Sequence, residues 1–99
     1  MVMLMKLTTR GFGLIYPASQ NRARAVNQIA QDLIVSLDTI LGVKTDFETT
    51  QSNSTTVVDV NTGESLYKVR TVTIPGGFQI GVYPRTNRAR EYLPQINIG

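Results

Sequence analysis

The sequence predicts an α+β protein in which one long amphipathic helix packs on a curved antiparallel sheet of four to five strands. Helical spacing of apolar residues across Val26–Leu41 and alternating spacing after Gly42 predict the two kinds of element. Turn residues then divide the second half of the chain into short strands. The chain has 99 residues, the size of one domain, and no linker interrupts it, so residues 1–99 are expected to form a single domain.

The long helix is expected from Ser19 to Leu41. Apolar side chains recur along it at helical spacing, which places them on one face. The residues of this face are Val26, Ile29, Ala30, Leu33, Ile34, Leu37, Ile40 and Leu41. Ser19 is the expected N-cap, and Gly42 is the expected residue that ends the helix in a left-handed conformation. A helix with one broad apolar face needs a sheet to lie on.

Four strands are expected after the helix. Their ranges are 43–50, 55–60, 65–74 and 78–83, separated by polar or glycine-containing turns, the last of which is Pro75-Gly76-Gly77. Phe78, Ile80 and Val82 form the inward face of the fourth strand, and Pro84 ends it. Alternation breaks within the third strand, because Tyr67 and Val69 lie on one face whereas Val72 and Ile74 belong to the other. We expect a bulge near residues 70–71, which would bring all four side chains to one face.

The two ends of the chain complete the predicted order. Residues 3–16 are β-like but interrupted by Gly11 and Gly13, so they form one bent strand or two short ones. Residues 86–93 are expected to form a short helix that Pro94 stops, and residues 95–99 a tail or an edge strand. The order of strand, helix and meander resembles the cystatin-like topology, a likeness that implies no function. A ferredoxin-like fold, which needs a second full helix between strands, is the alternative.

Composition excludes most catalytic chemistry. The chain has no Cys and no His, so it lacks a thiolate nucleophile, a disulfide, a zinc finger and a Ser-His-Asp triad. The closest acids, Asp46 and Glu48, share one face of a strand, a spacing that fits a solvated surface better than a metal site. We therefore expect a protein that is not an enzyme and that holds neither a metal nor a cofactor.

The start of the chain predicts the compartment. Residues 1–5 are apolar, but this run is far shorter than a signal sequence or a membrane-spanning helix, and Lys6 follows it. We expect a soluble cytoplasmic protein, or one carried in a particle assembled there, with no membrane partner.

A repeated tetrapeptide supplies the candidate binding residues. Asn-Arg-Ala-Arg occurs at 21–24 and at 87–90, at the start of each expected helix. Arginines in a first helical turn oppose the helix dipole, and this energetic cost is offset where the arginines bind an anion. The candidate anion or nucleic-acid contacts are Arg22, Arg24, Arg85, Arg88 and Arg90, with Tyr83 as an exposed aromatic beside them. The alternative is two solvated helix starts, with Asp32 and Glu91 as counter-charges.

Three functions follow from these observations. Thr- and Val-rich strands with little Lys, and apolar segments at residues 1–7 and 95–98, favour a non-enzymatic protein-interaction or self-assembly domain, with a second copy or another protein as partner. Small size and low charge also fit a structural or accessory protein of a phage or mobile element. The net charge of +3 and the arginines at two helix starts favour the alternative, a protein that binds nucleic-acid phosphates. The third possible function is a module that binds a small ligand or a peptide on a concave sheet.

Overall fold

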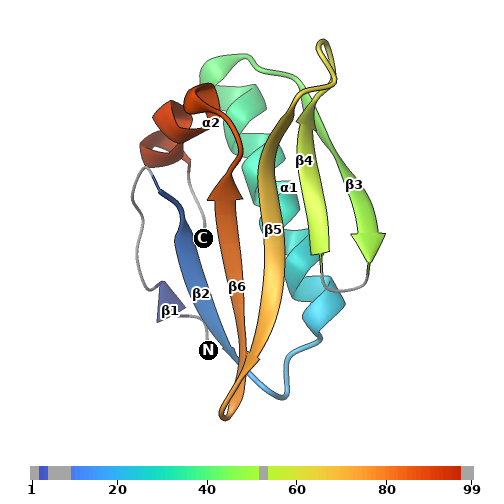
Figure 1. Ribbon diagram of the computed structural model, residues 1–99, viewed down its shortest axis with the longest axis vertical. Helices are drawn as coiled ribbons and strands as arrows, with labels where there is room; N and C mark the ends of the chain where they lie inside the picture. Colours follow the sequence, from blue (N-terminus) through green and yellow to red (C-terminus); the bar gives the residue numbers. More distant parts are fainter. Residues whose placement is uncertain (1–2, 5–9, 52–53, 97–99) are drawn as a thin grey trace.

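The computed structural model describes residues 3–4, 10–51 and 54–96 (Figure 1). Its elements are β1 (Met3–Leu4), β2 (Phe12–Pro17), α1 (Arg22–Leu41), β3 (Thr45–Gln51), β4 (Ser54–Asp59), β5 (Ser65–Ile74), β6 (Gly77–Pro84), α2 (Asn87–Tyr92) and a 3-10 turn at Leu93–Gln95. The strands form one sheet in the order β1-β2-β6-β5-β4-β3, and every neighbouring pair is antiparallel. The predicted α+β class with an antiparallel sheet is confirmed. The sheet holds five strands of six to ten residues and the two-residue β1.

Helix α1 carries the chain from one side of the sheet to the other. It follows β2 and leads to β3, which is the far edge strand of the sheet. Strands β3, β4, β5 and β6 then lie side by side in chain order, and β6 pairs with β2. Phe12 lies opposite Val82 in this closing pair, and Tyr16 opposite Phe78. In the described residues no helix separates β3, β4, β5 and β6, so the ferredoxin-like alternative is wrong.

The ends of α1 differ from the prediction at one of two positions. Asn21 is the N-cap, and its side-chain oxygen accepts a 3.0 Å hydrogen bond from the backbone N–H of Arg24. The predicted cap, Ser19, is wrong because a turn contains it, closed by the N–H of Gln20 donating to the carbonyl of Pro17 at 3.1 Å. Gly42 ends the helix with φ of 67°, as predicted.

The core lies between α1 and the inner face of the sheet. Leu33, Leu37 and Ile80 are fully buried there, each worth about 1.5–3 kcal/mol relative to an exposed side chain. The rest of the core comes from both layers: Phe12, Leu14, Tyr16, Ala25, Val26, Ile29, Ala30, Val57, Leu66, Tyr67, Val69, Phe78, Val82, Ala89, Leu93 and Ile96. Ile40 departs from the predicted apolar face and is exposed, whereas Leu41 in the same last turn of α1 packs against the core.

Strand β5 has its bulge at the opposite end from the one predicted. It pairs with β6 without a shift from Tyr67 opposite Pro84 to Ile74 opposite Gly77, so the predicted bulge at 70–71 is wrong and Val72 is left 53% exposed. Against β4 the register shifts between Val57 and Val58, and Leu66 is the extra residue. Leu66 and Tyr67 are consecutive and both fully buried, so the bulge buries Leu66 rather than Val72.

The described residues near each end of the chain contact the rest of the fold. The N-terminal β-like region forms two short strands, with Met3 opposite Ile15 and Leu4 opposite Leu14. The predicted short helix is α2, which Thr86 caps by accepting a 3.0 Å hydrogen bond from the N–H of Ala89. The described part of the possible edge strand at 95–99 is not a strand, because Gln95 ends the 3-10 turn and Ile96 is buried in the core, and residues 97–99 lie outside the described ranges. Within the described ranges, neither helix has the length and apolarity to cross a bilayer.

Candidate functional site

The two arginine-bearing helix starts lie at opposite ends of the sheet (Figure 1). Arg22 contacts Thr73 near the end of β5, whereas Arg88 contacts Glu64 just before β5 begins. Thr73 and Glu64 are nine positions apart, which is about 30 Å at about 3.3 Å per residue. The arginines of the two tetrapeptides therefore do not converge on one surface.

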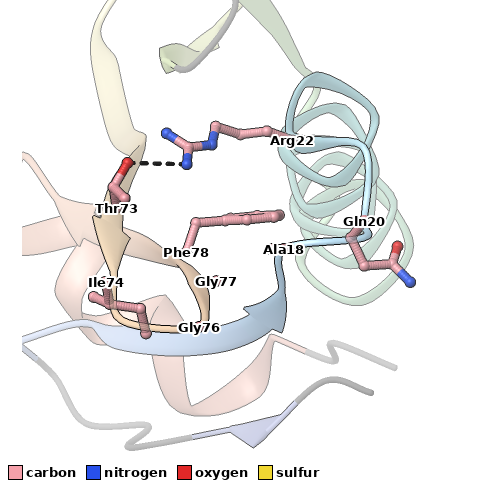
Figure 2. A pocket seen from close by; sticks show the side chains of 8 residues that line it. All are labelled: Ala18, Gln20, Arg22, Thr73, Ile74, Gly76, Gly77 and Phe78. Carbon is pink, nitrogen blue, oxygen red and sulfur yellow. Dashed lines mark hydrogen bonds between the residues drawn. The ribbon is translucent and has the colours of Figure 1, made fainter.

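Arg22 is held against the β5–β6 hairpin. Its Nη2 donates a 3.0 Å hydrogen bond to Oγ1 of Thr73, and its guanidinium carbon lies 5.0 Å from the centre of the Phe78 ring. Figure 2 shows this side chain reaching from the start of α1 across to Thr73, beside an open cavity of about 450 Å³. Phe78 in turn stacks on Tyr16, with ring centres 5.2 Å apart. Arg22 thus links α1 to the hairpin within its own chain.

Arg88 is bound by two carboxylates. Its Nη2 lies 2.6 Å from Oδ2 of Asp59 and 3.0 Å from Oε1 of Glu64. The Asp59 side chain is only 4% exposed. The hydrogen bond from Arg88 lowers the pKa of Asp59, assisted by the backbone N–H of Asn61, and the same bond raises the pKa of Arg88. This guanidinium ties α2 to the turn between β4 and β5.

The other three predicted arginines differ in their partners. Arg90 Nη1 donates a 2.6 Å hydrogen bond to the side-chain oxygen of Asn87. In the described part of the chain, the side chains of Arg24 and Arg85 have no hydrogen-bond or ion-pair partner. Nor do the described residues gather three acidic groups that could hold a metal ion.

Tyr83 lies on the outer face of the sheet, the face turned away from α1. Figure 1 views the sheet from this side, with α1 behind it. The alternation along β6 predicts this orientation, and the residue is 43% exposed. Register places Lys68 of β5 directly opposite Tyr83, and Arg70 opposite Gly81. Side chains opposite each other on antiparallel strands start about 5 Å apart. We call Lys68, Arg70 and Tyr83 the cationic platform.

The Tyr83 ring lies along β6 over Gly81. A Cβ placed on Gly81 would lie within 2.8 Å of the Tyr83 hydroxyl, Cζ and Cε2 atoms. The far end of the ring therefore occupies the space of the missing side chain at position 81. The ring leans over its own strand instead of standing up from the sheet, and the residue keeps 43% of its surface exposed.

The two cations of the platform are not neutralised nearby. Neither Lys68 nor Arg70 has a side-chain hydrogen bond or ion pair among the described residues. Their neighbours on β4 are the hydroxyl residues Thr56 and Ser54. The platform thus combines an exposed aromatic ring with two available positive charges.

The other half of the outer face is apolar. Toward the β5–β6 hairpin, the outward positions are held by Val72, Ile74, Ile15 and Pro17, with Gln79 between them. A shallow cavity of about 250 Å³ opens beside Ile15, Pro17 and Ile74. We call these four residues the apolar half.

Sequence reasoning placed Tyr83 outward but missed Lys68 and Arg70. The signal was present, because Lys68 and Arg70 alternate with Tyr67 and Val69, which face inward. The repeated Asn-Arg-Ala-Arg tetrapeptide instead favoured the arginines at the helix starts as candidate binding residues. Comparison of the chain with protein-family models, curated proteins and solved structures gave no match.

Proposed function

We propose that this protein is a non-enzymatic nucleic-acid-binding module that holds its ligand on the cationic platform. The observation that carries the proposal is the placement of an exposed aromatic ring opposite Lys68, next to Arg70, on a sheet face that no described helix covers. Cations contact phosphates, and an aromatic side chain offers a surface on which a base can stack. Arg85, two residues after Tyr83 and without a side-chain partner in the described residues, extends the positive surface.

Charge supports the same proposal. The net charge is +3, and the two carboxylates nearest to a predicted arginine, Asp59 and Glu64, are already bound by Arg88. Electrostatic contact with phosphates releases counterions, so affinity falls as salt rises. If Lys68 and Arg70 each contact one phosphate of a single strand, their removal lowers the salt slope by about 1.4, since each such contact contributes about 0.7.

The experiment measures binding of a fluorescent oligonucleotide by anisotropy across a range of salt concentrations. The test variant is Lys68→Gln with Arg70→Gln. The control is Arg24→Gln with Lys44→Gln, which removes two exposed cations away from the platform and takes the net charge from +3 to the same +1. We expect the test variant to lose affinity and salt slope and the control to keep both. Equal losses in the two variants would show nonspecific attraction to net charge and overturn the proposal.

Self-association is the second candidate, and the apolar half favours it. Val72 is 53% exposed and lies beside other apolar side chains on an open sheet, and two such sheets can pack face to face about 10 Å apart. The predicted terminal segments are less available for this, because Met3–Leu4 pairs with β2 of its own chain and Ile96 is buried. Light scattering on a sizing column tests the idea. A dimer that Val72→Lys converts to a monomer would support it, and a wild-type monomer would exclude it.

A further inference from the structure

We infer that the ligand of the cationic platform is a single strand with one base stacked on Tyr83, and that Gly81 is the positioning residue that keeps the ring over the sheet. This inference rests on the proposed function and narrows it to one class of nucleic acid. It also assigns a role to a glycine in the interior of β6, a strand with neighbours on both sides.

The backbone at Gly81 does not itself require glycine. The described glycines with positive φ are Gly11, Gly42, Gly63 and Gly76, and Gly81 is not among them. Glycine weakens the interior of a strand, because it adds conformational freedom to the unfolded chain and packs nothing. The feature that explains it here is the Tyr83 ring, which occupies the space over position 81. Any larger residue at 81 would push the ring away from the strand.

Neighbouring side chains repeat this arrangement one strand away. Gly13 of β2 lies opposite Gly81, and a Cβ on Gly13 would lie 2.7 Å from the side-chain nitrogen of Gln79. Two side chains of β6, those of Gln79 and Tyr83, thus cover two adjacent outward glycines. The surface under the Tyr83 ring is therefore bare backbone, and the residue, at 43% exposure, has ring surface to offer a flat ligand.

The cations lie close enough to act on the same ligand as the ring. Lys68 is opposite Tyr83, and Arg70 is two residues along β5, about 7 Å away at about 3.3 Å per residue. A base that stacks on the ring would bring its own phosphate, or the next one, toward these two side chains. Stacking on aromatic side chains accepts any base, so we expect little sequence preference.

The width of the sheet disfavours a duplex ligand. The five longer strands span four strand spacings, which is about 19 Å at about 4.8 Å each. The major groove of B-DNA is about 12 Å wide and admits a helix or a two-stranded ribbon. The outer face of the sheet is thus too wide to enter the groove. The bases of a duplex are also stacked on each other, whereas those of a single strand are free to stack on Tyr83.

The test compares short fluorescent oligothymidylate, oligouridylate and a duplex of equal length, with wild-type protein and three variants. Tyr83→Leu removes the ring, Tyr83→Phe keeps it, and Gly81→Ala displaces it. Stacking of one base corresponds to about 5- to 150-fold in affinity. We expect Tyr83→Leu to lose single-strand affinity within this range, Tyr83→Phe to stay within about twofold of wild type, and Gly81→Ala to fall between them. The DNA and RNA arms show which sugar is preferred.

A double-mutant cycle separates positioning from a general structural effect. If Gly81 acts through Tyr83, then Gly81→Ala costs no further affinity when added to Tyr83→Leu. An equal cost of Gly81→Ala in both backgrounds would overturn the positioning role. Tyr83→Trp gives a second readout, because the chain has no Trp and the introduced indole would be its only one. Stacking quenches its fluorescence on addition of oligothymidylate, whether or not the alanine variant folds.

The outcomes distinguish failure of this inference from failure of the proposed function. If Lys68→Gln with Arg70→Gln weakens binding but Tyr83→Leu does not, the platform binds phosphates and the stacking inference is overturned. Equal affinity for duplex and single strand, or unquenched indole fluorescence at saturation, also overturns it. If wild-type protein binds no oligonucleotide at low salt, both fail.

Discussion

Nη2 of Arg88 lies 2.6 Å from Oδ2 of Asp59, so the start of α2 is tied to the end of β4 by a nearly buried carboxylate. Glu64 adds a second carboxylate at 3.0 Å from the same nitrogen. An arginine with two acidic partners in its own chain has little free charge to offer a ligand. Arg88 is thus explained by the stability of the fold.

The Asp59–Arg88 pair should make the protein sensitive to acid. Because Arg88 lowers the pKa of Asp59 in the folded state, the ionised carboxylate stabilises the fold above its ordinary pKa. This contribution is lost as the pH falls through the lowered pKa of the folded state. We expect Asp59→Asn to reduce stability near neutral pH and to flatten the acid limb of a plot of melting temperature against pH. Asp38→Asn, which removes one carboxylate at an exposed position of α1, is the control and should reduce stability near neutral pH less than Asp59→Asn does.

Arg22 and Arg24 offer a matched pair for testing the contact in Figure 2. Arg22→Gln removes a hydrogen bond to Thr73 and the contact with the Phe78 ring, together worth about 1–2 kcal/mol. Arg24→Gln removes the same charge with no such contact. We expect urea unfolding to show the larger loss for Arg22→Gln, and oligonucleotide affinity to stay unchanged in both. Equal stabilities would show that the Arg22 contacts contribute nothing.

The Tyr67 hydroxyl anchors α2 to the sheet. It donates a 2.6 Å hydrogen bond to the carbonyl of Ala89, and burial raises its pKa, so it keeps its proton at neutral pH. Tyr67→Phe removes this buried hydrogen bond, at a cost of about 1–3 kcal/mol. For a domain of this size we expect a fall in melting temperature of about 4–8 °C per kcal/mol. Tyr92→Phe, which removes a half-buried hydroxyl from α2, should have a smaller effect.

Two glycines of β6 should respond differently to alanine. A Cβ on Gly77 would overlap the backbone carbonyl oxygen of Tyr16, whereas a Cβ on Gly81 would meet the movable end of the Tyr83 side chain. Backbone atoms in a paired strand cannot move without breaking the β2–β6 register. We expect Gly77→Ala to destabilise the protein by about 2–3 kcal/mol and Gly81→Ala by less than about 1 kcal/mol. Chemical denaturation of the two variants measures the difference, and equal losses would contradict it.

Local patterns predicted most of the fold. The helix end at Gly42, the bounds of β5 and the inward positions of β6 follow from periodicity and turn residues, because those signals act over a few residues. The pairing of β2 with β6 joins residues 60 to 70 positions apart, and no local pattern specifies such a partner. The bulge was misplaced for a similar reason. Its position is decided by the burial of Leu66, which depends on the packing of the whole domain.

The candidate site was less predictable than the fold. Outward alternation identified Tyr83, and the same rule applied to β5 would have identified Lys68 and Arg70. The contact between Tyr83 and Gly81 could not be predicted from the sequence, because it depends on the rotamer of Tyr83 rather than on the alternation of residues along β6. The partners of Arg22 and Arg88 could not be foreseen either, since both lie far away along the chain.

The two Asn-Arg-Ala-Arg tetrapeptides differ by one residue in their position relative to the start of the helix. Asn21 precedes α1 as its N-cap, whereas Asn87 is already the first residue of α2, after the cap Thr86. The side chain of Asn21 caps its helix by accepting from the backbone N–H of Arg24. In the second copy Thr86 is the cap, and the side-chain oxygen of Asn87 accepts from the guanidinium of Arg90 instead. An alignment that matched the two tetrapeptides would therefore equate an asparagine that caps a helix with one that lies inside a helix.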